Sequence, residues 1–348
     1  MGRKHKNKDD IHLPKNVYRG RSSYEYRPYS KGVKRPCFKL CSLSSPISEV
    51  WKKFEKREGR PSYNLTWLLN EYYHSPQFRK KGSKLKSKDT IKEQERQIQF
   101  LAKYTQKNGR SFGSAELKNI TKGTIRRYLD KREEDGAPVA GNREKSLISK
   151  AWNWALERDL IESSNPCMGV SRNPESPRDR YVTDQEYEIT YKLAQSPPYL
   201  PIMMELAYLC RMRKSEILKA TKHQVKEKGF DTKRLKGSRD TLTLWSDRLN
   251  QAIQAAYELA SKVSHISDDA PLIHDKWGVA IKKSAFESAW QRLKTKMKEA
   301  GIEPFTFHDL KAKGVSDFEG NKQDASGHKT PAQVATYDRK KKEVKPTK

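Results

Sequence analysis

Residues 308–311 read His-Asp-Leu-Lys, residues 327–328 read Gly-His, and Tyr337 follows nine residues after that second histidine. Arg213 and Lys236 lie upstream of these motifs. A DNA phosphodiester is a poor electrophile because its non-bridging oxygens carry negative charge, which fixed cations can neutralise as the transition state forms. Cations, histidines and a tyrosine in this order therefore predict a site at which a tyrosine attacks a phosphodiester.

The composition points to a polyanionic partner. The chain has 72 Lys and Arg against 43 Asp and Glu, for a formal net charge of +29 at pH 7. The excess is spread along the chain, with +11 over residues 1–60, +8 over 61–177 and +10 over 178–348. A positive field of this extent favours nucleic acid over other partners.

Several classes of protein are disfavoured by the same sequence. The longest apolar segment, residues 199–210, contains Glu205 and is too short to span a bilayer. No apolar stretch follows the charges at the N-terminus, so no signal peptide is expected. Four cysteines lack zinc-site spacing with a histidine pair, and reduced thiols are the simplest interpretation. The sequence predicts a cytoplasmic protein with no metal and no cofactor.

Residues 1–60 are predicted to form a small β-rich domain that binds DNA. Aromatic and basic residues alternate between residues 16 and 42, with a turn at 30–32, and an amphipathic helix is expected over 47–58. Such strands could present one face to a groove and its phosphates, and a basic tail with a structural hairpin is the alternative. The candidate DNA-binding residues are Arg19, Arg21, Tyr24, Tyr26 and Arg27.

Residues 61–177 are predicted to form a bundle of four helices. These are expected over 65–74, over 91–107, from Thr121 onward, and over 143–158 with Asn142 as the N-cap. A basic stretch joins the first two helices, and it fits either a phosphate-contacting loop or a solvated linker. Its candidate DNA-binding residues are Arg79, Lys80, Lys81, Lys84 and Lys86. Proline and serine at 173–178 indicate a linker before a helix capped by Thr183.

Five boxes, in order, resemble those of tyrosine recombinases. Residues 210–218 resemble the first box, in which an arginine precedes an acidic residue by three places, and residues 235–238 look like the family's β-hairpin lysine. Residues 308–311, Gly327-His328 and Tyr337 look like the second box and the nucleophile. The amino half is similar to that of lambda-type phage integrases, so the resemblance covers essentially the whole chain.

The resemblance implies a multidomain α+β fold. An arm-type DNA-binding domain would occupy residues 1–60, and a helical core-binding domain of the SAM-like kind residues 61–177. A mixed α/β catalytic domain would occupy residues 178–348. Lys236 would lie on the turn of a hairpin formed by residues 230–235 and 241–245.

Each residue type fits one part of the implied reaction. The guanidinium fork of Arg213 matches phosphate geometry, and Glu216 would orient Arg213 or a neighbouring residue rather than act as a base. His308 would donate to the phosphate or hold the nucleophile's proton, and His328 would complete the set of donors. A tyrosine phenol has an ordinary pKa of about 10, so nearby cations must favour its phenolate during attack.

Lys236 would protonate the departing 5′ oxygen. One position departs from the family pattern, because Lys311 stands where an arginine is usual. Lysine keeps the positive charge but loses the two-pronged geometry, which leaves room for Lys313 or Lys329 to assist.

The resulting hypothesis is a phage or prophage integrase that acts as a homotetramer on double-stranded attachment sites. A DNA-bending protein and an excisionase are possible partners, and no membrane is involved. A host-type recombinase that resolves dimers and a non-catalytic repressor that retains the fold are the alternatives. A metal-dependent nuclease is disfavoured, because no carboxylate cluster surrounds Tyr337 in the sequence.

Overall fold

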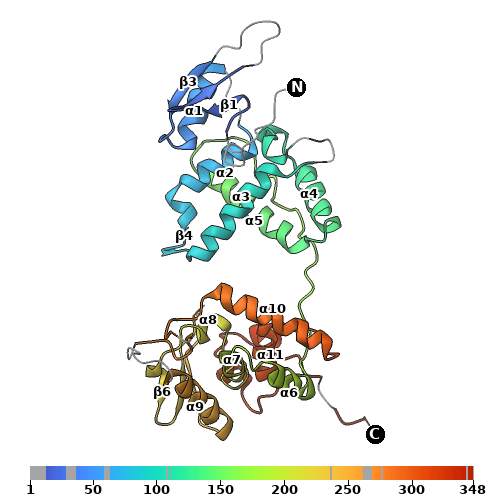
Figure 1. The fold of residues 1–348 in the computed structure, drawn as a ribbon. Coiled ribbons are helices and arrows are strands. Elements are labelled where there is room, and N and C mark those ends of the chain that lie inside the picture. Colours follow the sequence, from blue (N-terminus) through green and yellow to red (C-terminus); the bar gives the residue numbers. More distant parts are fainter. Residues whose placement is uncertain are drawn as a thin grey trace. The chain divides into compact units, whose positions relative to one another are not determined.

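The computed structural model describes residues 13–28, 37–58, 63–106, 109, 111–235, 237–261, 269–275, 277–341 and 344–347. The chain divides into two compact units, residues 1–176 and residues 177–348 (Figure 1). Each unit has its own hydrophobic core, and each is described by itself.

The first unit begins with a small antiparallel sheet. Its strands β1 (Val17–Arg19), β2 (Ser23–Tyr26) and β3 (Phe38–Ser42) pair in that order. Helix α1 (Ile47–Glu58) packs against β3, and the ring of Phe54 meets that of Tyr26 edge-on at 5.1 Å. The β-rich start and the helix over 47–58 are as predicted, whereas the turn at 30–32 lies outside the described residues.

A helical bundle completes the first unit (Figure 1). It consists of α2 (Leu65–His74), α3 (Lys88–Lys103), α4 (Lys122–Glu134) and α5 (Pro138–Leu156), with the short helices η3 (Phe112–Ser114) and η4 (Leu117–Asn119) between α3 and α4. Side-chain caps open three of the main helices, at Asn64, Ser87 and Thr121. A turn η2 (Pro76–Arg79) and a hairpin of β4 (Lys80–Lys81) and β5 (Lys84–Leu85) join α2 to α3.

The predicted cap at Asn142 is wrong. Helix α5 begins at Pro138, because proline suits the first turn of a helix, where its missing N–H group would have no partner anyway. Asn142 therefore lies inside the helix and is buried, and its Nδ2 donates to the carbonyl oxygen of Asn173 at 2.9 Å. The asparagine thus fastens the end of the bundle instead of capping a helix.

The second unit surrounds the apolar helix α7 (Tyr199–Leu209). It contains α6 (Asp184–Leu193), α8 (Lys214–Ile217), α9 (Asp247–Ser261), α10 (Lys283–Glu299), α11 (Phe307–Ser316), α12 (Lys322–Ser326) and α13 (Pro331–Ala335). A short helix η5 (Lys222–Gln224) leads into the antiparallel sheet of β6 (Val225–Lys226), β7 (Gly229–Thr232) and β8 (Thr241–Leu244). The predicted capping box of Thr183 and Glu186 begins α6, and the predicted hairpin is β7 and β8.

Helices α7 and α11 pack closely against each other (Figure 1). A Cβ atom at Gly314 would lie 2.0 Å from the carbonyl oxygen of Tyr208 on α7, so only glycine allows this approach. The contact sets the position of α11, which carries several of the predicted site residues. None of the described helices is long and apolar enough to cross a membrane.

Candidate active site

Helix α11 presents His308 and Lys311 on one face. The side chain of Asp309 accepts from the backbone N–H of Thr306 at 2.7 Å and so caps the start of the helix. Residues three apart lie on the same side of a helix, so His308 and Lys311 project together. Local sequence thus fixes which two groups α11 offers.

Tyr337 lies among three of the predicted residues. Its hydroxyl is 3.0 Å from Nε2 of His308, and its ring stacks on that of His328 with a centroid distance of 4.7 Å. The Nζ atom of Lys311 lies 5.4 Å from the centroid of the tyrosine ring. Groups from α11, from the residues after α12 and from the residues after α13 therefore meet at one phenol.

Arg213 is held by Glu216 as the sequence analysis proposed. Its Nη1 donates to Oε1 of Glu216 at 2.7 Å, and its Nη2 donates to Oγ of Ser238 at 3.3 Å. Glu216 is fully buried and also pairs with the fully buried Arg234, whose Nη1 lies 3.2 Å from Oε2. Arg234 was not predicted, although it stands two places before Lys236. Arg213, Ser238, His328 and Tyr337 line one cavity of about 410 Å³.

Lys236 lies outside the described residues, but the loop around it is tied to the histidine segment. The backbone N–H of Arg239 donates to the carbonyl oxygen of Gly327 at 2.8 Å. Gly327 has a φ of +70°, and a Cβ atom there would lie 2.2 Å from the carbonyl oxygen of Arg239. Glycine is therefore required for the hairpin loop to reach the segment that carries His328.

Both histidines are held neutral. The pKa of His308 and that of His328 are each lowered to about 4, first by withdrawal from water and then by neighbouring positive charge, that of Arg213 included. His328 accepts or donates one hydrogen bond, between Nδ1 and Oγ of Ser326 at 2.8 Å. Its buried Nε2 has no partner among the described residues. A neutral imidazole with a free nitrogen can accept a proton or donate one, depending on its tautomer.

Asp309 ties the tyrosine segment to α11. This carboxylate is buried and accepts from Nη1 of Arg339 at 2.7 Å, two residues after Tyr337. It also accepts from Nε of Arg178 at 2.9 Å. The pKa of Asp309 lies below its ordinary value: burial acts to raise it, but the hydrogen bonds from Thr306 and Arg339 outweigh that effect. Sequence analysis missed this role, because no pattern links residues so far apart.

The two lysines considered as helpers lie in different surroundings. Lys313 is 1% exposed and points away from the site, where it pairs with Asp184 and, at 2.8 Å, with Asp317. Its charge is already satisfied, so the suggestion that it assists Lys311 is wrong. Lys329 is exposed and lines the cavity beside Tyr337.

The candidate DNA-binding residues divide by exposure. Arg19, Arg21 and Arg27 are exposed on the small sheet, and Arg79, Lys80, Lys81 and Lys84 are exposed around the hairpin of β4 and β5. Tyr24 and Tyr26 are only 3% and 6% exposed, so their assignment as DNA-contacting side chains is corrected to the core. Lys86 donates to the carbonyl oxygen of Phe78 and to Oε1 of Gln94, and it fastens the base of the hairpin.

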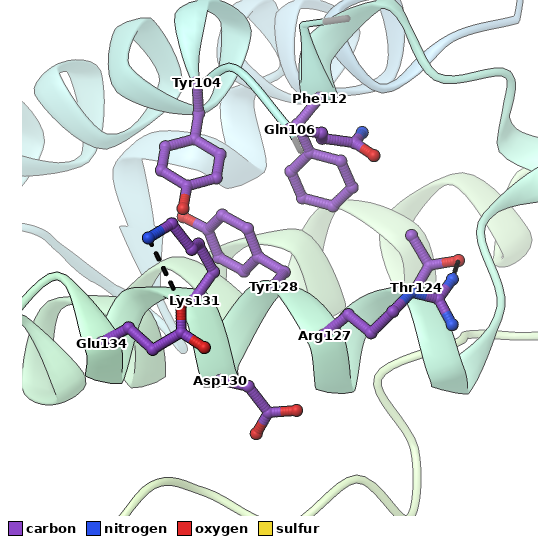
Figure 2. Close-up of a pocket in the computed structure, with 9 residues that line it drawn as sticks. All are labelled: Tyr104, Gln106, Phe112, Thr124, Arg127, Tyr128, Asp130, Lys131 and Glu134. Atoms are coloured by element: carbon purple, nitrogen blue, oxygen red, sulfur yellow. Dashed lines mark hydrogen bonds and ion pairs between the residues drawn. The ribbon is translucent and has the colours of Figure 1, made fainter. Parts of the chain in front are cut away.

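The helical bundle also contains a cavity of about 420 Å³ (Figure 2). Its aromatic wall stacks internally, with 4.8 Å between the ring centroids of Phe112 and Tyr128. The hydroxyl of Tyr128 donates to Glu144 at 2.5 Å, and Lys131 pairs with Glu134 at 3.3 Å. These polar groups are occupied by one another, so the cavity offers no reactive group of the kind found around Tyr337.

Comparison with known proteins gives one family match, and it falls in the second unit. Residues 180–343 match the model of the phage integrase family. No curated protein matches the sequence of this chain. No group of three or more His, Cys, Asp or Glu side chains that could hold a metal ion occurs among the described residues.

The fold is similar to that of solved integrases. A lambda integrase dimer bound to a COC′ core site is 19% identical to this chain and superposes with a TM-score of 0.66. The match covers 98% of this chain and 99% of the lambda integrase chain. A lambda integrase tetramer bound to a Holliday junction is 19% identical, with coverages of 96% and 98% and a TM-score of 0.65. The integrase of transposon Tn1549 in complex with circular intermediate DNA is 14% identical, with coverages of 79% and 95% and a TM-score of 0.61. These likenesses extend the predicted α+β architecture over nearly the whole chain.

Proposed function

We propose that this chain, whose residues 180–343 match the model of the phage integrase family, is a site-specific tyrosine recombinase that cleaves and rejoins DNA through a covalent bond to Tyr337. One observation carries this proposal. The hydroxyl of Tyr337 lies 3.0 Å from Nε2 of the neutral His308, and the guanidinium of Arg213 and the amine of Lys311 lie around the same phenol.

We assign each part of the reaction to a residue of the site. The phenol oxygen of Tyr337 attacks phosphorus, and its proton passes to Nε2 of His308. Arg213 neutralises the non-bridging oxygens as the transition state forms, and the free Nε2 of His328 donates to them. The bond to the 5′ oxygen breaks, and we assign the proton that this oxygen needs to Lys236.

The products are a 3′-phosphotyrosyl enzyme and a free 5′ hydroxyl. One phosphoester bond forms for each one that breaks, so a second 5′ hydroxyl can reverse the step without a nucleoside triphosphate. This balance is what an enzyme that exchanges strands requires. The same balance disfavours a nuclease, which would release its product by hydrolysis.

We infer that the chain acts on paired attachment sites in double-stranded DNA. A lambda integrase dimer bound to a core site and a tetramer bound to a Holliday junction have this fold, and they support a homotetramer here. The fold is shared by a transposon integrase as well, so the mobile element is a phage, a prophage or a transposon. We place the protein in the cytoplasm of a bacterial host, where a DNA-bending protein and an excisionase could assist it.

We further propose that residues 1–60 bind arm-type sites and that residues 61–177 bind the core site. Arg19 and Arg21 are exposed on the small sheet, in a position to contact phosphates. Helix α1 packs against α2, so deleting the first sixty residues would expose the apolar side of the bundle. Replacing Arg19 and Arg21 with alanine is a cleaner test, and footprinting should show loss of protection outside the crossover region while core protection persists. Identical footprints would limit these residues to a structural role.

The test of the central proposal is a search for the covalent intermediate. Nicked duplexes from the DNA that flanks the gene should trap wild-type protein on DNA in the presence of EDTA, and Tyr337→Phe should bind the same duplexes without forming the adduct. Tyr257→Phe, on α9 in the same unit, is the matched control and should keep the adduct. An adduct peptide that contains another tyrosine would contradict the assignment. Specific binding without any adduct would favour the repressor alternative.

A further inference from the structure

Lys311 is a buried lysine beside the ring of Tyr337. Its side chain is 0% exposed, and Nζ has no hydrogen-bond partner among the described residues. A lysine ammonium has three N–H donors and no acceptor. Burying such a charge without acceptors is costly, so a lysine in this setting is expected to release its proton.

The charges that face Lys311 are mostly positive. Arg211 and Arg213 come from the segment before α8, and Arg234 comes from the residues after β7. Glu216 on α8 is an anion that stabilises the ammonium form. Its two oxygens already accept from Arg213 and Arg234 and from the backbone N–H of Leu235.

His308, His328 and Tyr337 also lie near Lys311, and they carry no negative charge that would stabilise its ammonium form. His308 on the same helix and His328 after α12 are neutral, because the pKa of each is lowered to about 4. Tyr337 presents the face of its ring to Nζ. The pKa of Lys311 itself is lowered to about 6, first by burial and then by Arg234 and Arg213.

We propose that Lys311 is a neutral amine in the DNA-free protein and takes up one proton from solvent when a phosphodiester is seated against Arg213. The inference rests on the proposed function, since the phosphate arrives only if DNA occupies this site. The phosphate brings one negative charge and two acceptor oxygens to an amine that has no hydrogen-bond acceptor among the described residues. An opposite charge within a few ångströms favours the charged form of the amine.

A lysine at position 311 has a property that an arginine there would not have. A guanidinium stays protonated in proteins, whereas an amine changes its charge readily when buried. Lys311 is therefore a conditional cation. Its amine is charged only when a phosphate is present to be neutralised. In the DNA-free protein the neutral amine does not repel Arg213 and Arg234.

Proton uptake on DNA binding is the direct test. Binding of the duplex that gives the Tyr337 adduct is measured by calorimetry at pH 7.5 in buffers of different ionisation enthalpy, with Tyr337→Phe protein to prevent cleavage. The slope of the binding enthalpy against the ionisation enthalpy of the buffer gives the number of protons taken up on binding. Protein with Lys311 should take up about one more proton than Lys311→Arg protein in the same Tyr337→Phe background. The affinity of the lysine form should also fall by up to about tenfold per pH unit between pH 7.5 and 9, relative to the arginine form. Equal slopes and parallel pH profiles would overturn the inference.

A second measurement needs no DNA and separates failure of this inference from failure of the proposed function. The equilibrium constant for unfolding in urea is compared between wild type and Lys311→Met from pH 7 to pH 9. A neutral amine in the folded protein predicts that the wild-type constant falls about tenfold per pH unit relative to the variant, because only the unfolded chain then binds the proton. A ratio that does not change with pH would show that Lys311 is charged in the free protein, and would overturn the inference even if the adduct forms.

Discussion

The two sides of helix α11 each bury a lysine, but the surroundings of the two amines are opposite in kind. Lys311 and Lys313 are both buried, but Lys311 has no hydrogen-bond partner among the described residues, whereas Lys313 contacts Asp184, Asp317 and the hydroxyl of Tyr181. The pKa of Lys311 is lowered and that of Lys313 is raised. The side of α11 that carries Lys311 is called the unsatisfied side after this amine, and the side that carries Lys313 is called the satisfied side.

The difference separates groups that wait for a ligand from groups that hold the fold. An unsatisfied buried polar group costs free energy, and native structures tolerate few of them. Two of those in this chain, Nζ of Lys311 and Nε2 of His328, lie around Tyr337. Substitutions on the two sides are therefore expected to have different effects on cleavage and on stability.

The largest expected effect is on cleavage and belongs to Lys311. Lys311→Ala should slow single-turnover cleavage of a nicked duplex by about 10²- to 10³-fold, because a transition-state cation is lost. Lys311→Arg should keep the rate or raise it, and DNA affinity should change little in either variant. Wild-type cleavage by Lys311→Ala would show that another cation neutralises the phosphate, with Lys329 the first to examine.

The next effect is on stability and belongs to Lys313. Lys313→Met should lower the free energy of unfolding by about 3 kcal/mol, because it removes the buried partner of Asp317 and Asp184. Lys311→Met, its matched control two residues away, should leave that free energy unchanged or raise it, since no partner is lost. Urea denaturation followed by circular dichroism measures both. Equal losses in the two variants would abolish the distinction between the two sides.

The third prediction concerns the placement of Tyr337 by the satisfied side. Arg339→Met should lower the cleavage rate by about tenfold, because the tyrosine segment loses its tie to Asp309 while every group that touches the phosphate remains. Asp309→Asn should produce a similar loss, and the double variant should cost no more than either single one. Binding to a nicked duplex, measured by gel shift, should be unchanged. Additive losses would mean that the two residues act independently.

Sequence analysis could predict the residues around Tyr337 because each has a chemical type that the reaction demands. It could not predict Arg234, Asp309 and Arg339 as supports, since their partners become neighbours only through tertiary packing. Helices 47–58 and 65–74 were found with their observed bounds, because apolar periodicity there is strong.

Where prediction failed, two physical reasons recur. Alternating aromatic and basic residues identify a strand, but the alternation does not say which side is covered, and so Tyr24 and Tyr26 were placed on the wrong face. At α5, the preference of asparagine for an N-cap competed with that of proline for the first turn, and Pro138 prevailed.

The smallest expected effect is the pH dependence that His328 adds to stability. Its pKa is lowered to about 4 in the folded protein from an ordinary value of 6.5, so below pH 6.5 the unfolded chain binds a proton that the folded chain does not. Stability contributed by this group is therefore complete above pH 6.5 and is lost as the pH falls toward 4. Between pH 7 and pH 5.5, wild type should lose about 1 kcal/mol of unfolding free energy relative to His328→Gln. Asp309, on the satisfied side, adds no pH dependence to stability in that range, because its pKa is lowered from the ordinary value of a carboxyl group and it stays ionised. Asp309→Asn should accordingly change the stability by an amount that is constant between pH 5.5 and pH 7. Urea denaturation at a series of pH values measures both variants, and a pH-independent difference for His328→Gln would show that this imidazole finds a partner in the free protein.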